Sequence, residues 1–283
     1  MTATRQLLVC PECHGTLVWR PAEAECTSCG RTFGIANDIP DFLPGERRPT
    51  IEAFLARYLS VRHDERWTDD DRDLLAGLPF EDRSGRRTSM WRTRSRGLVA
   101  LQRELRRSYG AERLVICEVG AGVAWMSYRL ALGGHTAVAC DVNVDERDGL
   151  GAARHYLSMD IDLVRARATM DRLPLAGASV DVVVCAASFH YAVDAAAQLS
   201  ALVEAARILK PGGSAVILDS PVYTTQDAGE RMIDEWTGAH GGAATARDAG
   251  YLVRDDIRRA MVAAGLEPAF RRHWMGSRWT ANF

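Results

Sequence analysis

Four of the seven cysteines stand in two close pairs near the N-terminus. Each pair encloses two residues, and twelve residues separate the pairs. Two residues between thiolates let one tight turn present both sulfurs to the same ion, and two such turns complete a tetrahedral site. Four thiolates suit zinc and leave no open coordination position. We therefore predict a structural Zn²⁺ site whose ligands are Cys10, Cys13, Cys26 and Cys29.

A second chemical motif is the segment 115–124, VICEVGAGVA, which has the pattern of a strand entering a glycine turn and then a helix. Glycines let a backbone approach a ligand closely, and a helix N-terminus supplies amide donors. Such a turn also occurs in dinucleotide-binding dehydrogenases. Glu118, just before the turn, would repel a pyrophosphate and could accept hydrogen bonds from a cationic amino-acid group. Asp141 ends the next strand, where a carboxylate can bind both ribose hydroxyls.

Two further segments follow at suitable distances: MDRLPLAGASVDVVVCAASFHY at 170–191 and ILKPGGSAVILDS at 208–220. With the glycine turn and Asp141, they resemble the class I S-adenosylmethionine-dependent methyltransferases, of the type 11-like kind, over about residues 95–220. The resemblance implies a Rossmann-like α/β sheet with helices on both faces. It also implies S-adenosyl-L-methionine as the cofactor.

The same resemblance implies roles for individual residues. Glu118, Gly120 and Gly122 would hold the methionine end of the cofactor, Asp141 the ribose, and Val142 the adenine. Thr169, Met170 and Asp171 would lie near the adenine, and Ala186 and Ala187 near the sulfonium. Thr169 takes the place of the acid that usually accepts from the adenine amino group, so that main-chain amides could bind adenine instead.

Arginines precede this region in the segment MWRTRSRG. Arg92 and Arg94 are candidates to bind the cofactor carboxylate, because a guanidinium pairs with a carboxylate through two hydrogen bonds. The alternative is that they belong to a solvated helix face.

The residues His190 and Tyr191 follow the strand that would border the cofactor, so they stand where an acceptor must arrive. Methyl transfer depends mainly on positioning, and a base helps when the nucleophile is a hydroxyl or an amine. An imidazole titrates near neutrality, which makes His190 the candidate base and Tyr191 its catalytic neighbour. The alternative is that His190 only packs within its loop.

The chain that must position these residues alternates between helix and strand after about residue 97. This order is typical of a parallel sheet covered by helices on both faces. We expect helices at 97–109, 125–134, 196–209 and 254–265, and strands at 113–120, 136–142, 180–188 and 214–220.

The N-terminal segment, LLVCPECHGTL followed by ECTSCGRTFGIANDIPDFLP, resembles a zinc-ribbon family that activates or accompanies tRNA, rRNA and protein methyltransferases. The likeness covers about residues 6–44 and includes Ile39, Pro40, Phe42 and Leu43. We therefore expect a β-rich zinc ribbon at 1–44, a helical connector or lid at 45–95, and a methyltransferase domain at 96–283.

Composition favours a small-molecule substrate over a nucleic acid. The net charge is −2 and 25% of the residues are charged, so no global basic charge attracts RNA. An arginine-rich stretch between Arg83 and Arg113, together with the ribbon, keeps a tRNA or rRNA substrate as the alternative. A non-catalytic cofactor-binding module is a second alternative. The absence of a signal peptide or membrane-spanning run predicts a cytoplasmic protein without a membrane partner, and the oligomeric state and the acceptor atom stay open.

Overall fold

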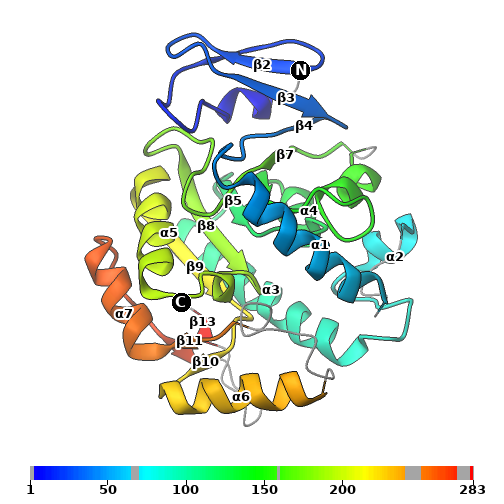
Figure 1. Cartoon of the computed structure of the whole chain (residues 1–283), viewed down its shortest axis with the longest axis vertical. Coiled ribbons are helices and arrows are strands. Elements are labelled where there is room, and N and C mark those ends of the chain that lie inside the picture. Colours follow the sequence, from blue (N-terminus) through cyan, green and yellow to red (C-terminus); the bar gives the residue numbers. More distant parts are fainter. Residues whose placement is uncertain (1–2, 65–69, 158–159, 240–249, 273–280, 283) are drawn as a thin grey trace.

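The computed structural model describes residues 3–64, 70–157, 160–239, 250–272 and 281–282 (Figure 1). A central sheet of five parallel strands has the order β7-β6-β5-β8-β9. The chain thus runs outward from β5 in one direction and then restarts beside β5 in the other. Ligands of such doubly wound sheets bind at the carboxyl ends of the strands, where the order reverses. In this chain that place is between β5 and β8.

The bounds of the sheet strands and of the helices around them follow the predicted alternation. The sheet consists of β5 (Val115–Val119), β6 (Thr136–Asp141), β7 (Leu163–Arg167), β8 (Val180–Ala186) and β9 (Leu209–Leu218). The helices are α1 (Arg48–Asp64), α2 (Arg72–Gly77), α3 (Thr88–Tyr109), α4 (Trp125–Leu132), α5 (Ala195–Ile208), α6 (Gln226–Ala239) and α7 (Arg254–Ala263).

Short elements complete the fold. The 3₁₀ turns are η1 (Ala3–Leu7), η2 (Leu150–His155) and η3 (Phe189–Tyr191). Two pairs of short strands lie in the C-terminal part of the chain. Strand β10 (Val222–Tyr223) pairs with β11 (Leu252–Val253), and β12 (Arg271–Arg272) pairs with β13 (Ala281–Asn282).

Alternate residues of the sheet strands enter two separate apolar cores, one on each face. In β5, Ile116 packs with α3 and α4, whereas Cys117 packs on the opposite face with α5 and α7. Val182 and Val183 in β8 divide in the same way. This explains why the strands are apolar throughout. The predicted Rossmann-like sheet with helices on both faces is confirmed.

The N-terminal region forms a four-stranded antiparallel sheet at one end of the molecule (Figure 1). Its strands are β1 (Leu17–Trp19), β2 (Glu23–Cys26), β3 (Thr32–Ala36) and β4 (Ile39–Pro40). This confirms the predicted β-rich N-terminal part. We call residues 5–44 the ribbon.

The ribbon is joined to the edge of the central sheet. Phe42 N–H donates to the Arg167 carbonyl at the end of β7 (2.8 Å), and Val9 N–H donates to the Pro174 carbonyl (3.0 Å). Leu8 and Phe42 belong to the same apolar core as Val164 in β7. The ribbon therefore covers an edge strand that would otherwise present unpaired backbone groups.

Three elements of the fold differ from the expected ones. The helix expected at 97–109 begins at Thr88, so Trp91 and Arg94 lie in its first two turns. The edge strand β7 and the helix α6 were not expected. In the part of the chain that the structure describes, no helix is long and apolar enough to cross a membrane.

Candidate functional site

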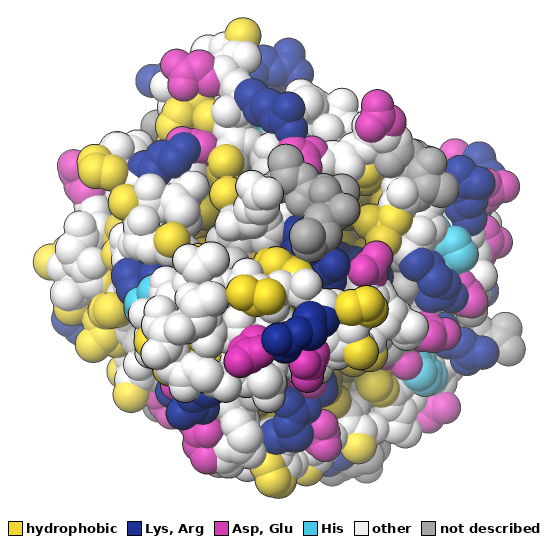
Figure 2. Space-filling view, turned by 90° about the horizontal axis from the view of Figure 1, so that it is seen from above, with side chains coloured by type: hydrophobic (Ala, Val, Ile, Leu, Met, Phe, Trp, Pro, Cys, Tyr) yellow, Lys and Arg dark blue, Asp and Glu magenta, His cyan; other side chains and the backbone are white. Residues whose placement is uncertain are grey.

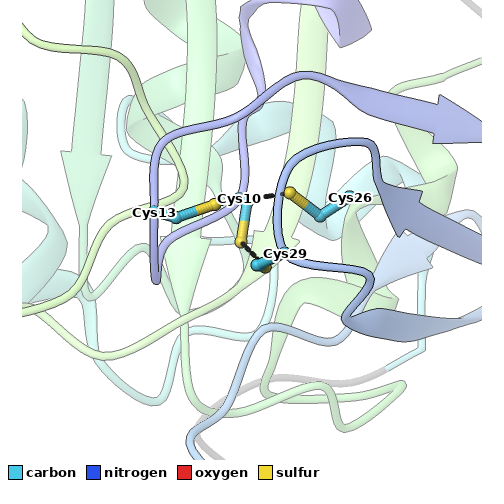
Figure 3. A group of neighbouring side chains, drawn as sticks. All are labelled: Cys10, Cys13, Cys26 and Cys29. Carbon is cyan, nitrogen blue, oxygen red and sulfur yellow. Dashed lines mark hydrogen bonds between the residues drawn. The ribbon is translucent and has the colours of Figure 1, made fainter.

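The four predicted metal ligands come together between the two turns of the ribbon. Figure 3 shows their side chains pointing toward one another, and the four sulfurs lie within 4.8 Å of one another. The Cys13–Cys26 and Cys10–Cys29 sulfur pairs are 3.4 and 3.7 Å apart. Sulfurs bound tetrahedrally to zinc at about 2.3 Å would be roughly 3.8 Å apart. The cluster is compatible with a zinc ion.

Both cysteine pairs are held by turns of the same design. His14 N–H donates to the Cys10 carbonyl, and Gly30 N–H donates to the Cys26 carbonyl. His14 and Gly30 each have a positive φ, 57° and 71°, which turns the chain back after the second cysteine. Burial raises the pKa of the Cys10 thiol to about 12. Burial also raises the pKa of the Cys26 thiol, but the backbone N–H groups of Cys29 and Ser28, together with the neighbouring thiols, lower it to about 6. These amides favour the thiolate, which is the form that binds metal.

A second site lies at the carboxyl ends of β5 and β6. The glycine turn after β5 is attached to the neighbouring strand β6, because the Gly120 and Ala121 N–H groups both donate to the Cys140 carbonyl. Gly120 has a φ of 72°, and a Cβ added there would lie 2.2 Å from the Ser188 Cβ. Glycine is required at this position because both the backbone conformation and the space exclude a side chain.

Asp141, at the end of β6, joins this turn to the next loop. Its Oδ2 accepts from Gly122 N–H and its Oδ1 accepts from Asn143 N–H, both at 2.7 Å. Burial raises the pKa of the Asp141 carboxyl to about 6, in opposition to these hydrogen bonds. A carboxylate has about four acceptor positions, so each oxygen can still accept from a ligand.

A cavity of about 130 Å³ opens beside Asp141 and the glycine turn. It collects residues from α1, β5 and β6 and from the segments that follow β7 and β8. Seven of the predicted site residues line it: Gly120, Gly122, Asp141, Val142, Met170, Ala187 and Tyr191. Ala187 is held with a φ of 57°. The cavity occupies the place where doubly wound sheets bind their ligands.

Helix α1 forms one wall of this cavity, through Phe54, Leu55 and Tyr58. Composition and spacing did not single out these three residues, nor Asn143 and Ser188, as part of a site. An amphipathic pattern identifies a helix but does not say which cleft it will cover. The cavity is smaller than the roughly 300 Å³ at which small-molecule pockets begin.

An ion pair and a histidine–carboxylate contact hold the end of α1 to the loop that follows β6. Arg62 makes a bidentate pair with Asp148, with both N···O distances at 2.8 Å, and the Asp148 side chain is only 1% exposed. Next to it, His63 Nε2 lies 3.1 Å from Asp145 Oδ1. The loop that carries Asp145 and Asp148 begins at Asp141, so α1 is tied to the same loop that the site uses.

Glu118 lies behind the cavity rather than in its lining. The carboxylate accepts from Ser127 N–H at 2.8 Å and from Ser127 Oγ at 2.5 Å, and so caps the first turn of α4. Burial raises its pKa to about 7, against the Ser127 hydrogen bonds and the positive charge of Arg94. Its predicted contact with a ligand amino group remains a prediction.

The two predicted arginines differ in position. Arg92 is exposed on α3, whereas Arg94 points inward, with its guanidinium 4.8 Å from the centre of the Trp91 ring. Burial lowers the pKa of Arg94, and Asp219 opposes that shift. Asp219 follows β9 with a φ of 54°, and burial raises its pKa to about 6. Arg94 therefore lies where its charge reaches both Glu118 and Asp219.

His190 lies in η3, with Nδ1 3.3 Å from the hydroxyl oxygen of the fully buried Ser220. Burial, together with Arg94, lowers the pKa of His190 to about 4. The imidazole is therefore neutral at pH 7 but a weak base, whereas an effective base has a pKa near the working pH. Its catalytic role remains a prediction, and it does not line the described cavity.

The remaining predicted residues stand around the cavity. Thr169 is 8% exposed. Asp171 pairs with Arg47, 2.6 Å from its Nη1. Burial opposes ionisation of Asp171, but the Arg47 hydrogen bond contributes to a net lowering of its pKa. Ala186 ends β8 one residue before the lining residue Ala187.

Comparison with known proteins identifies the central region. Residues 117–217, which run from β5 to β9, match the methyltransferase domain family. The chain has a methyltransferase fold. No curated protein sequence matches it at a significant level.

Solved structures with this fold are similar in shape and distant in sequence. Magnesium protoporphyrin IX methyltransferase from Synechocystis PCC 6803, solved with bound SAH, is 17% identical with a TM-score of 0.50, covering 68% of this chain and 83% of that one. A provisionally assigned methyltransferase from Bacillus halodurans C-125 is 16% identical with a TM-score of 0.46, covering 57% of this chain and 64% of that one. The chain thus spans less than two thirds of the Bacillus protein.

A third similar structure is the complex between the Haloferax volcanii Trm112 methyltransferase activator and a provisionally assigned methyltransferase. That match is 24% identical with a TM-score of 0.47, covering 64% of this chain and 71% of that one.

Replacement of the two glycines in the turn after β5 should lower the stability by different amounts. Gly120→Ala would force a clash with Ser188 in addition to a positive φ, so it should lower the free energy of unfolding by roughly 2–5 kcal/mol. Gly122 has a φ of 52° but no atom within 4 Å of an added Cβ, so Gly122→Ala should cost only about 1 kcal/mol. Urea unfolding of both variants measures the difference, and equal losses would contradict this account of the turn.

Proposed function

We propose that the chain is an S-adenosyl-L-methionine-dependent methyltransferase that acts on a small or medium-sized organic acceptor, at oxygen, nitrogen or carbon. The observation that carries the proposal is the arrangement of Asp141 and the glycine turn. Asp141 is a half-buried carboxylate with spare acceptor capacity. It is hydrogen-bonded to the turn and lines a cavity at the switch point of a methyltransferase fold.

The residues present fit this cofactor. Asp141 would accept from the ribose hydroxyls, and Val142 and Met170 offer apolar contacts for adenine. Thr169, next to Met170, has a buried side chain whose hydroxyl could bond to the adenine edge. Arg94 would face the carboxylate of the amino-acid end, and Glu118 its ammonium group. When bound, the cofactor supplies an electrophilic methyl group on a sulfonium.

The acceptor would enter beside Ala187 and Tyr191. Charges of both signs are interspersed on the face at the ribbon end, and Figure 2 shows no continuous basic surface there. RNA-binding surfaces are typically strongly basic, so this face gives an RNA substrate no support.

One observation favours an RNA acceptor instead. The solvent side of α3 carries a row of exposed arginines, namely Arg92, Arg96, Arg103, Arg106 and Arg107. Binding of tRNA that weakens steeply with salt, and that is lost when Arg103 and Arg106 are replaced by glutamine, would favour this second candidate.

We further propose that α1 is the lid of the cofactor site. The cavity of about 130 Å³ is smaller than most small-molecule pockets, and a shift of α1 would enlarge it. The Arg62–Asp148 and His63–Asp145 pairs would hold it closed. Hydrogen exchange of 48–64 should slow when S-adenosylhomocysteine binds, and unchanged exchange would count against a lid.

Calorimetric titration with S-adenosylhomocysteine tests the proposed function. Asp141→Asn should weaken binding at least tenfold, because an amide nitrogen cannot replace the carboxylate oxygen as an acceptor. Wild-type affinity should rise between pH 5 and pH 7.5, because the Asp141 carboxyl is protonated below its pKa of about 6 and accepts best when ionised. Asp141→Asn should lose part of this rise.

Asp234→Asn, an exposed change on α6, is the matched control and should bind like the wild type. Folded wild-type protein that binds neither S-adenosylmethionine nor S-adenosylhomocysteine would exclude the enzyme and the non-catalytic cofactor-binding module alike. Binding without turnover on any acceptor would favour that module.

We also propose that Cys10, Cys13, Cys26 and Cys29 bind one structural zinc ion. Four thiolates would leave no position for a reactive water. The ribbon shares its core with the central sheet through Leu8 and Phe42, so loss of the metal should loosen both.

The zinc proposal predicts one zinc per chain by elemental analysis. Cys13→Ser should lose the metal and lower the free energy of unfolding by at least about 3 kcal/mol, a fall in Tm of roughly 6–12 °C. Thr27→Ser, which keeps a hydroxyl in the same ribbon, should retain metal and stability. A stable, zinc-free Cys13→Ser protein that no longer binds S-adenosylhomocysteine would instead place the ribbon in the active site.

A further inference from the structure

Three aromatic rings meet on the wall of the cofactor cavity. Phe54 and Tyr58 lie one turn apart on α1, and Tyr191 lies in η3 after β8. The ring centres of Phe54 and Tyr58 are 5.7 Å apart. Tyr191 stands at 67° to Phe54 and at 85° to Tyr58, with centres 5.9 and 6.2 Å away. Two ring directions nearly at right angles therefore border one small space, and all three residues line the cavity.

The position of the rings follows from the elements that carry them. Ala187 and Tyr191 both follow β8, and β8 pairs directly with β5, whose glycine turn forms the adjoining wall. A ligand with its ribose at Asp141 and its amino-acid end over Gly120 and Gly122 would place the sulfur that links them near the end of β8. That is the side from which Tyr191 approaches.

The chemistry of the rings suits a positive charge. Aromatic faces attract cations, and boxes of perpendicular rings bind groups that have no hydrogen to donate. Burial raises the pKa of Tyr58 and of Tyr191, so both phenols stay neutral at pH 7 and their faces remain electron-rich. Asp141 lines the same cavity and adds negative charge near it. A sulfonium is a cation of this kind, because its three substituents are carbons.

We propose that Phe54, Tyr58 and Tyr191 form an onium box that recognises the positively charged sulfonium of the methyl donor and releases the neutral thioether product. The proposal rests on the proposed function and deepens it. In the transfer, the S–CH₃ bond breaks and its electron pair stays on sulfur, while the acceptor's lone pair forms the new bond to carbon. The acceptor then loses its proton to solvent. The positive charge leaves the box, and with it the attraction that held the donor.

The box also gives α1 a function in the cycle. Two of its three walls belong to α1, so the charged donor would favour the closed helix more than the neutral product does. Arg62 is one turn after Tyr58, and its guanidinium lies 5.4 Å from the centre of the Tyr58 ring while it pairs with Asp148. Arg62 therefore stands over one face of the Tyr58 ring, so the donor would meet the other face.

Charged and neutral ligands of the same shape provide the test. Calorimetry would compare S-adenosylmethionine and sinefungin, which carry a cation at this position, with S-adenosylhomocysteine, which does not. The wild type should prefer the charged ligands by about 2- to 30-fold, the range from an exposed to a desolvated cation–π contact. Tyr58→Leu and Tyr191→Leu should reduce that ratio toward one and change the affinity for S-adenosylhomocysteine less than about threefold.

The phenylalanine variants Tyr58→Phe and Tyr191→Phe are the matched controls, because they keep a ring and should keep the ratio. A wild-type ratio of one, or leucine variants that weaken all three ligands equally, would overturn the proposal and leave the rings a packing role. Tetramethylammonium that binds only together with S-adenosylhomocysteine would assign the box to an acceptor's cation and likewise overturn it. Failure of the folded wild type to bind any of the three ligands would be a failure of the proposed function, distinct from these results.

Discussion

The site depends on one half-buried carboxylate that accepts hydrogen bonds from two loops. Asp141 accepts from Gly122 in the turn after β5 and from Asn143 in the loop after β6. Neither amide has a backbone partner among the described residues, so the carboxylate supplies the hydrogen bond that each of them makes. Asn143 then continues the arrangement, because its side chain accepts from Asp145 N–H and donates to the Asp148 carbonyl. These two aspartates are the partners of α1, so one carboxylate supports the glycine turn and, through its loop, the helix that covers the cavity.

The ribbon is connected to the same helix. Its last residues pair with the end of β7, and Asp41 accepts hydrogen bonds there from Arg48, at the start of α1, and from Arg167, at the end of β7. The start of α1 is therefore fixed by the ribbon and the sheet edge, and its other end by the loop after β6. A ribbon that loses its fold would release the first of these attachments. The cysteine cluster has no chemistry of its own, but through this attachment it can influence the cavity that α1 lines.

The features predicted from sequence were those set by local geometry. Two CxxC turns and a strand ending in glycines each specify their own shape, which is why the cysteine cluster and the glycine turn lie where the sequence placed them. Strand β7 was missed because its pattern, LVRAR, carries two arginines. Arg165 is 3% exposed in the structure and donates to the Leu150 and Asn37 carbonyls, partners that only the folded ribbon and η2 provide. The aromatic wall from α1 was missed for the same reason, since periodicity does not reveal what a helix covers.

Acidic and basic side chains both surround the site, and Arg62 and Arg94 bring positive charge to Tyr191. Burial raises the pKa values of Glu118, Asp141 and Asp219 to about 7, 6 and 6. The surroundings of each carboxyl group therefore oppose its negative charge. A folded-state pKa above the unfolded value means that ionisation destabilises the fold as the pH rises through that value. Arg94 offsets part of this cost at Glu118 and Asp219. Asp141 has no such partner among the causes of its shift, so a cation bound in the adjoining cavity would relieve its burial most directly. A sulfonium within the aromatic box would bring its charge to the cavity that Asp141 lines, and methyl transfer would remove it.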